Sequence, residues 1–143
     1  MKVKQISVFL ENKSGRLAKV TQLLGDNNIN IRALSIADTT DFGILRLIVN
    51  EPVKAWQVLK EGEYTVSETE IIAIGIPDHP GGLAGILKTL DECKVNIEYM
   101  YAFVGRSGSD AVVVFRVEEI DRAVKLLKEA GVKLLGGEEV YSS

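Results

Sequence analysis

The 143-residue sequence has few of the residues on which metal, redox and disulfide chemistry depend. It contains one cysteine, Cys93, and one histidine, His79. A single cysteine cannot form an internal disulfide, and no cysteines and histidines stand at the spacing of a zinc site. Cys93 falls on the apolar stripe of a predicted helix, where packing is its expected role. There is also no carboxylate pair and no nucleophile beside a base. We therefore predict no metal site, no cofactor and no catalytic residue, and a protein that is not an enzyme.

Long apolar runs and an excess of basic residues are also missing. No apolar run approaches the roughly 18 residues that a transmembrane helix needs. The N-terminal segment has neither the hydrophobic region nor the cleavage site of a signal peptide. The net charge is −3, whereas a surface that binds nucleic acid carries a basic stripe. We therefore expect a cytoplasmic protein that binds neither membranes nor nucleic acids.

What the sequence does contain is an internal repeat. Residues 12–34 read NKSGRLAKVTQLLGDNNINIRAL, and residues 78–100 read DHPGGLAGILKTLDECKVNIEYM. With residue 12 aligned on residue 78, the identical pairs are Gly15/Gly81, Leu17/Leu83, Ala18/Ala84, Leu24/Leu90, Asn30/Asn96 and Ile31/Ile97. A repeat of this length predicts a duplicated domain. We place the first domain at residues 1–69 and the second at residues 70–143. Domains this small bury little core and gain stability from a shared surface.

The hydrophobic pattern predicts the same order of elements in both copies: strand, helix, strand, strand, helix, strand. The predicted strands are residues 2–10, 29–36, 44–49 and 63–68 in the first copy, and 71–76, 95–103, 111–117, 132–135 and 138–141 in the second. Two helices on one face of a four-stranded antiparallel sheet make the ferredoxin-like arrangement. The sequence thus predicts an α+β protein of two ferredoxin-like domains in tandem. The other face of each sheet looks too apolar to be left bare.

In each copy, a glycine turn joins the first strand to the first helix. The N-terminus of a helix carries unpaired N–H groups and a partial positive charge, and a glycine lets a ligand approach the backbone closely. This combination suits a carboxylate or a phosphate. In the first turn we expect Ser14 to cap the helix. In the second turn we expect Pro80 to occupy the first helical positions.

These repeated residues resemble the ACT domain family, whose members are small regulatory modules that bind amino acids. The resemblance lies in NKSGRLA…INI and DHPGGLA…VNI, and it covers essentially the whole chain with no catalytic domain attached. It implies domains that pair side by side into a joint sheet and hold an amino acid at their interface. It also implies a homodimer or a higher homo-oligomer, and an enzyme as a candidate partner.

The resemblance implies a set of ligand-binding residues in each copy. They are Asn12, Ser14, Gly15 and Asn30 in the first copy, and Asp78, Gly81, Gly82 and Asn96 in the second. The alternative for Asn12 and Asp78 is that they only cap turns through their own backbone. The alternative for Asn30 and Asn96 is that they only end helices and start strands. Because Asp78 would attract an ammonium group and repel a carboxylate, we do not expect the two sites to be equivalent.

Our leading hypothesis is a non-enzymatic sensor that binds an amino acid at ACT–ACT interfaces and regulates a partner or its own oligomeric state. No obvious buried charge lies near either turn, which favours glycine, serine or a branched-chain residue as ligand. The alternative is a ligand-independent assembly or regulatory subunit of an amino-acid biosynthetic enzyme. The segment GGLAG at 81–85 imitates a dinucleotide-binding turn, but its glycine spacing does not fit that motif. The loop at residues 104–110 is a candidate lid.

Overall fold

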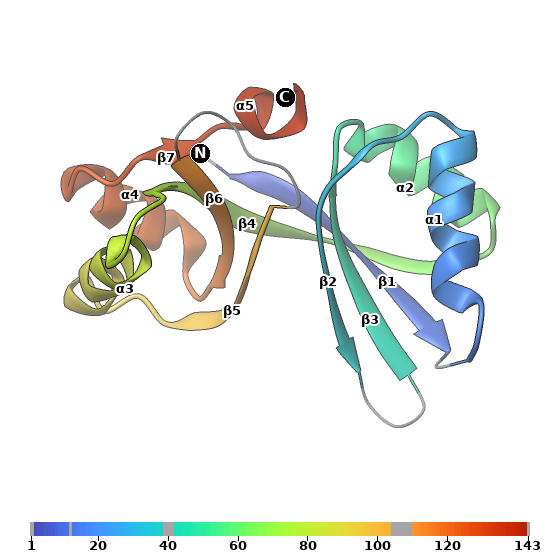
Figure 1. Ribbon diagram of the computed structural model, residues 1–143, viewed down its shortest axis with the longest axis horizontal. Helices are drawn as coiled ribbons and strands as arrows, with labels where there is room; N and C mark the ends of the chain where they lie inside the picture. The colour runs from blue at the N-terminus through green and yellow to red at the C-terminus, as the bar shows by residue number, and fades with distance from the viewer. Residues whose placement is uncertain (1, 12, 39–41, 104–109, 143) are drawn as a thin grey trace. The chain divides into compact units, whose positions relative to one another are not determined.

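A computed structural model describes residues 2–11, 13–38, 42–103 and 110–142 of the chain (Figure 1). The chain forms two compact units. The first unit is Lys4–Thr69, and the second unit is Glu70–Ser143 together with Met1–Val3. Each unit contains one copy of the sequence repeat, and each is described separately below.

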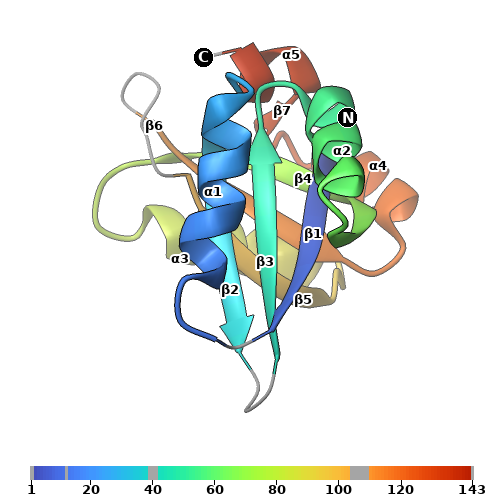
Figure 2. The same cartoon turned by 90° about the vertical axis from the view of Figure 1, so that its right-hand side faces the viewer.

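The first unit is a four-stranded sheet with two helices on one face. It consists of β1 (Val3–Glu11), α1 (Arg16–Asp26), β2 (Ile31–Asp38), β3 (Phe42–Val49), α2 (Pro52–Glu61) and the start of β4 (Thr65–Pro77). The strand order is β2-β3-β1-β4, and β3 is antiparallel to both β1 and β2. Figure 2 shows α1 and α2 in front of the same face of β1, β2 and β3. This is the predicted ferredoxin-like arrangement.

The core of the first unit follows from alternation along β1. Ile6, Val8 and Leu10 lie on the helix side of the sheet, where they pack in one cluster with Val20 and Leu24 of α1. The register continues this face onto β3, since Val8 is opposite Leu45 and Ile6 is opposite Leu47. Successive strand residues point to opposite faces, so this alternation fixes the register.

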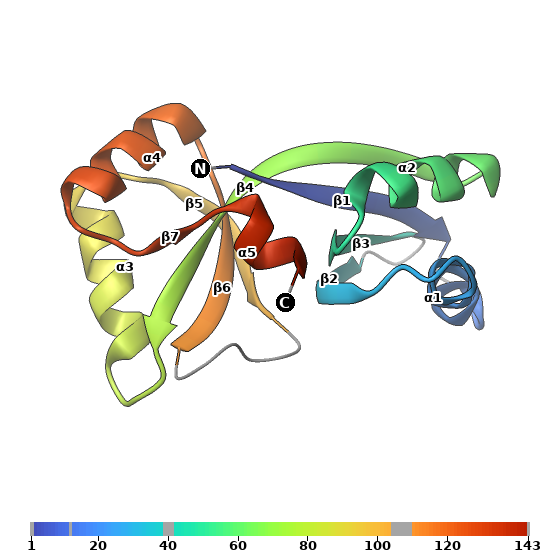
Figure 3. The same ribbon diagram turned by 90° about the horizontal axis from the view of Figure 1, so that it is seen from above.

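The second unit repeats this arrangement and adds one short helix. It consists of the end of β4, α3 (Gly82–Glu92), β5 (Ile97–Ala102), β6 (Asp110–Val117), α4 (Ile120–Glu129), β7 (Leu134–Leu135) and α5 (Gly137–Ser142). β4 lies between β7 and β6, and β6 pairs with β5. Figures 1 and 3 show α3 and α4 on one face of this sheet. Cys93 packs against the core on that face, which confirms its predicted role.

Three of the predicted strands are different in the structure. The strands expected at residues 63–68 and 71–76 are one continuous strand, β4, which ends the first unit and begins the second. The strand expected at residues 138–141 is wrong, because these residues lie in α5. The Glu139 carboxylate accepts a hydrogen bond from the Gly136 N–H at 3.2 Å, which satisfies a backbone donor at the start of that helix. The predicted loop at residues 104–110 lies outside the described residues except for Asp110.

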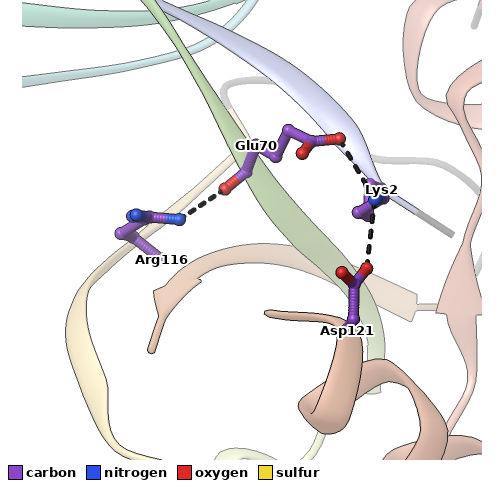
Figure 4. A network of polar contacts seen from close by, with 4 residues as sticks. All are labelled: Lys2, Glu70, Arg116 and Asp121. Carbon is purple, nitrogen blue, oxygen red and sulfur yellow. Dashed lines mark hydrogen bonds and ion pairs between the residues drawn. The ribbon is translucent and has the colours of Figure 1, made fainter. Parts of the chain in front are cut away.

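The first residues of the chain belong to the second unit. Val3 is fully buried, and the Lys2 ammonium lies 3.1 Å from Asp121 and 3.6 Å from Glu70. Arg116 donates a hydrogen bond to the backbone carbonyl of Glu70 at 3.0 Å, which extends this polar network (Figure 4). Lys2, which the repeat alone assigns to the first domain, is therefore held by side chains of the second copy.

Candidate ligand-binding turns

The two glycine turns have the same backbone conformation. Gly15 has φ 85° and ψ −9°, and Gly81 has φ 87° and ψ −7°. Both lie in the left-handed region, which glycine enters without steric cost. A Cβ built on either glycine would meet no atom within 4 Å. The backbone conformation, and not crowding, thus selects glycine here, and the space above each glycine is open.

The hydrogen bonds of the two turns also correspond one to one. The bonded pairs, N–H donor first, are Lys13–Glu11, Arg16–Lys13 and Lys19–Gly15 in the first turn, and His79–Pro77, Gly82–His79 and Gly85–Gly81 in the second. Their lengths lie between 2.8 and 3.3 Å. The same backbone therefore delivers the chain to α1 and to α3.

Neither helix begins as the sequence suggested. The residue before α1 is Gly15 and not Ser14, and no side chain caps this end of the helix. The prediction that Ser14 is the cap is therefore wrong. Pro80 likewise precedes the cap residue Gly81, so the prediction that it occupies the first helical positions is wrong. In both turns, a left-handed glycine takes the place that a side-chain cap or a proline was expected to fill.

The side chains around the two turns differ strongly in charge. Lys13, Arg16 and Lys19 surround the first turn and line a shallow hollow there with Ser14 and Gly15. The aligned positions in the second copy are His79, Gly82 and Gly85. These three cations are residues that the sequence analysis missed. They stand at positions where the two copies differ. A comparison of those positions would have revealed them, whereas a search for identical positions passes over them.

One carboxylate partly balances the cations of the first turn. The Lys13 ammonium lies 2.9 Å from Glu11, and the Arg16 guanidinium lies 3.9 Å from it. The hydrogen bond from Lys13, and then the charges of Lys13 and Arg16, hold the pKa of Glu11 below its ordinary value. Glu11 is therefore ionised at neutral pH, and the three cations and one anion leave this turn with a net positive charge.

The second turn is more tightly packed than the first. A Cβ built on Gly82 would overlap the backbone carbonyl oxygen of Pro77, and it would lie 3.3 Å from the Ile76 side chain. Arg16 carries a full side chain at the aligned position of the first copy. Gly82 is therefore required by close backbone contact, which is a structural role, and Gly81 is the glycine that faces open space.

Within one unit, the predicted asparagines lie far from the turns. Asn30 precedes β2, and its N–H donates to the Asn50 side chain at 2.9 Å, beyond the end of β3. The turn after β1 lies at the other end of β3, because Glu11 is opposite Phe42. The second unit repeats this geometry: the carbonyl of Asn96 accepts a hydrogen bond from the Glu118 N–H at 3.1 Å.

Two further candidate residues flank the glycines. Asp78 is exposed beside Gly81. Asn12, the aligned residue of the first copy, lies outside the described residues. The structure therefore brings Ser14 and Gly15 together in one turn, and Asp78, Gly81 and Gly82 together in the other. It does not bring either asparagine, Asn30 or Asn96, to the turn of its own unit.

Each unit exposes apolar side chains on its first helix and on its outer strand. In the first unit they are Leu17 on α1 and Leu34 and Ile36 on β2; in the second they are Leu83 on α3 and Met100 on β5. All are between 37% and 43% exposed. Leu17 aligns with Leu83, and Leu34 aligns with Met100. An edge strand with exposed apolar residues is a surface that pairs readily with another chain.

Two other features, a metal site and a membrane-spanning helix, are missing from the described parts of the chain. Among these residues, no group of three or more His, Cys, Asp or Glu side chains is placed to hold a metal ion. The helices of the same segments are all too short or too polar to cross a membrane. The repeated turns are thus the strongest candidate site.

Comparisons with known proteins agree with the fold and the repeat. A family model described as an ACT domain pair matches residues 1–141. Protein BT0572 from Bacteroides thetaiotaomicron, a solved structure, is 45% identical, with a TM-score of 0.93, over 100% of this chain and 98% of that chain. The ligand-free regulatory subunit of aspartate kinase from Thermus thermophilus shares the fold at 17% identity, with a TM-score of 0.62, over 89% and 91% of the two chains.

A curated relative is larger than this chain. The aspartokinase of Corynebacterium efficiens is 27% identical over 91% of this chain, which spans 33% of the length of that relative. The similarity is therefore to one part of that kinase. The match of the family model over nearly the whole sequence, together with two units of the same topology, shows that the chain belongs to the family of ACT domain pairs.

Proposed function

We propose that this chain is a regulatory protein without catalytic activity that binds an amino acid at interfaces between ACT domains. Binding would control a partner enzyme or the oligomeric state of the chain itself. The observation that carries the proposal is the repeated left-handed glycine turn, with open space above Gly15 and Gly81. Because glycine has no Cβ, a ligand can approach the backbone more closely here than at any other type of residue.

The first turn favours the carboxylate of an amino acid. The N-terminus of α1 attracts an anion. So do the side chains of this turn, which are net positive because Lys13, Arg16 and Lys19 outnumber Glu11. The second turn lacks these cations and carries Asp78, which favours an ammonium group. The two turns are therefore unlike in charge, and we expect their affinities for one amino acid to differ.

The separation of the asparagines from the turns favours a site that is completed by another domain. Asn30 and Gly15 stand at opposite ends of β3, so one unit cannot use both on the same small ligand. The exposed apolar residues of α1 and β2 supply a surface on which such a domain would pack. A homodimer is the simplest assembly that provides this second domain. Amino-acid binding would then favour one assembly over another, which is the condition for regulation.

The relatives support a regulatory role and suggest the kind of partner. A protein that shares the fold is the regulatory subunit of an aspartate kinase, and the curated relative is an aspartokinase. An enzyme that acts on amino acids is therefore the partner that we would test first. It would be offered as a purified protein, with and without the amino acid that binds.

The proposal is tested by a thermal-shift screen against the twenty amino acids, followed by calorimetry on each hit. A ligand at 100 times its dissociation constant stabilises the folded state by about 2.7 kcal/mol, which is several degrees for domains of this size. The variants Gly15→Val and Gly81→Val should each reduce the shift. Gly25→Ala is the matched control, because Gly25 also has no atom within 4 Å but lies inside α1.

Each outcome of this experiment has a definite meaning. Selective shifts that Gly15→Val or Gly81→Val removes, in a variant that still folds, support the sensor. Shifts that survive both substitutions would place the ligand elsewhere. If no amino acid shifts the melting temperature, the sensor hypothesis fails, and assembly that ignores amino acids becomes the leading hypothesis.

A further inference from the structure

An open groove in the first unit runs along one flank of α1. Its volume is about 750 Å³, which is within the range of small-ligand sites. Arg16 and Lys19 line it near the start of the helix, Leu23 in the middle, and Asp26 at the last residue. The turn between α2 and β4 forms the opposite wall and contributes Glu63. The groove lies entirely within one unit.

One end of the groove is positive. Arg16 and Lys19 line this end, and the first turn of α1 contains no acidic residue. Glu11 also lines it, but Lys13 lies 2.9 Å from that carboxylate and Arg16 lies 3.9 Å from it. The charges of Arg16 and Lys19 are therefore not fully balanced, and a carboxylate would find two cations here.

The other end is negative. Asp26 is the last residue of α1, and Glu63 lies in the facing turn. A Cβ built on Gly62 would lie 2.9 Å from the Leu23 side chain, so this turn packs against α1 about one helical turn before Asp26. Gln22, a neutral side chain, donates a hydrogen bond to the Asp26 carboxylate at 2.7 Å. Two carboxylates thus face this end of the groove.

This order of charges runs against the helix itself. The helix macrodipole favours acidic residues near the N-terminus and basic residues near the C-terminus, and α1 has the reverse. α4 of the second unit follows the rule, with Asp121 in its first turn and Lys128 in its last. Local departures of this kind are expected where a site requires them. The stability of α1 therefore does not explain why these charges stand where they do.

The middle of the groove is apolar. Leu10, Leu23 and Tyr64 are among its lining residues, and Leu23 lies between Lys19 and Asp26 along α1. Lys19 and Asp26 are seven residues apart, which corresponds to about 10 Å along the helix axis. A ligand that satisfies the whole groove therefore has an anionic and a cationic end with an apolar chain between them.

We propose that this groove binds a small dipolar molecule, with a carboxylate at Arg16 and Lys19 and an ammonium group at Asp26 and Glu63. The site goes beyond the turns at the domain interfaces, because it needs no second domain. It is also specific to the first copy. The aligned positions of Arg16 and Lys19 in the second copy are Gly82 and Gly85. Gly131 occupies the place of Glu63 in the same pattern of hydrogen bonds at the end of α4.

The test compares three probes of one chain length on the full chain. They are 6-aminohexanoate, which has both charges, and hexanoate and hexylamine, which have one each. Titration calorimetry at low salt should show one 6-aminohexanoate per chain, bound at least about tenfold more tightly than either single-charge probe. Amide shifts in nuclear magnetic resonance spectra should move at both ends of α1. Equal affinity for the three probes, or no binding of any, would overturn the proposal.

Substitutions locate the two ends. Glu63→Gln keeps the size of the side chain and should bring 6-aminohexanoate to within about twofold of hexanoate. Asp26→Asn tests the same end if Glu63→Gln does not fold. Lys88→Gln is the matched control, because Lys88 is exposed on α3 and aligns with Gln22. An unchanged preference in both acidic-end variants would refute the assignment. Glu63→Gln should leave the amino-acid response of the turns intact, so this proposal and the proposed function fail separately.

Discussion

The two glycine turns are the same backbone with two different sets of side chains. Gly15 and Gly81 differ by 2° in both φ and ψ, from 85° to 87° and from −9° to −7°. Around this shared backbone, the first copy places Lys13, Arg16 and Lys19, and the second places His79, Gly82 and Gly85. After duplication, the conformation of the turn was kept while its charge changed. A backbone that is retained without its side chains indicates that the geometry itself has a role in both units.

The largest expected effect on stability comes from the difference in packing between the two turns. Gly82→Ala forces a Cβ into the carbonyl oxygen of Pro77, so the end of β4 and the start of α3 must move apart. We expect a loss of about 3 kcal/mol or more in the free energy of unfolding. Arg16→Ala, at the aligned position, removes a half-buried side chain at the surface and should cost less than about 1 kcal/mol. Urea unfolding of both variants measures the difference. Equal costs would contradict the tighter packing of the second turn.

The next effect tests whether the turns are equal in conformation. Gly15→Ala and Gly81→Ala each place a Cβ in open space but in the left-handed region. Each should therefore lose about 1–2 kcal/mol of stability, and the two losses should agree within about 0.5 kcal/mol. The measurement is urea unfolding monitored separately for each unit by amide exchange. A cost at only one glycine would mean that the two turns are not the same structure in solution.

Much of this comparison follows from the sequence, and the failures have identifiable causes. The repeat correctly predicted the two turns, because a left-handed position leaves glycine as the favoured residue in both copies. Ser14 was wrongly expected to cap α1. Serine and glycine are both common cap residues, and the sequence does not say which of two neighbours takes that position. The helix α5 was missed because Val140 and Tyr141 favour a strand, and the contact of Glu139 with the Gly136 N–H is visible only in three dimensions.

The groove could not be read from the sequence for a related reason. Its two ends come from α1 and from the turn after α2, and these segments are brought together by packing, as between Leu23 and Gly62. Periodicity places Arg16, Lys19 and Asp26 on one flank of a helix, but it does not say what faces that flank. The charge reversal along α1 was nevertheless visible as a departure from the usual placement of charges on a helix.

A smaller effect compares the ends of α2 and α4. The residue in the left-handed conformation is Glu63 with φ 66° after α2, and Gly131 with φ 78° after α4. Glu63→Gly should therefore stabilise the first unit by about 1 kcal/mol, and Gly131→Ala should destabilise the second by a similar amount. Thermal unfolding of the two variants provides the comparison. Destabilisation by Glu63→Gly would show that the glutamate makes compensating contacts in the folded chain.

The smallest expected effects are on the pH dependence of stability, which should differ between the two units. The pKa of Lys2 is raised above its ordinary value of 10.5, first by its hydrogen bond to Asp121 and then by the charges of Asp121 and Glu70. The pKa of Glu11 is lowered below 4.5, first by its hydrogen bond to Lys13. The stability from Lys2 is present below its unfolded pKa and is lost as the pH rises through the raised value. The stability from Glu11 is present above its unfolded pKa and is lost as the pH falls through the lowered value.

These signs predict opposite pH profiles for two conservative variants. Lys2→Met should be less stable than the parent chain at neutral pH. The difference should shrink above pH 10.5, where the unfolded chain deprotonates, and disappear as the pH rises through the raised pKa of Lys2 in the folded chain. Glu11→Gln should differ from the parent at neutral pH. The difference should shrink below pH 4.5, where the unfolded chain takes up a proton, and disappear as the pH falls through the lowered pKa of Glu11 in the folded chain. Both differences should fall with added salt, because the pairs are exposed. Urea unfolding across pH measures them. A Lys2→Met difference that persists undiminished at high pH would mean that Lys2 acts through packing and not through its charge.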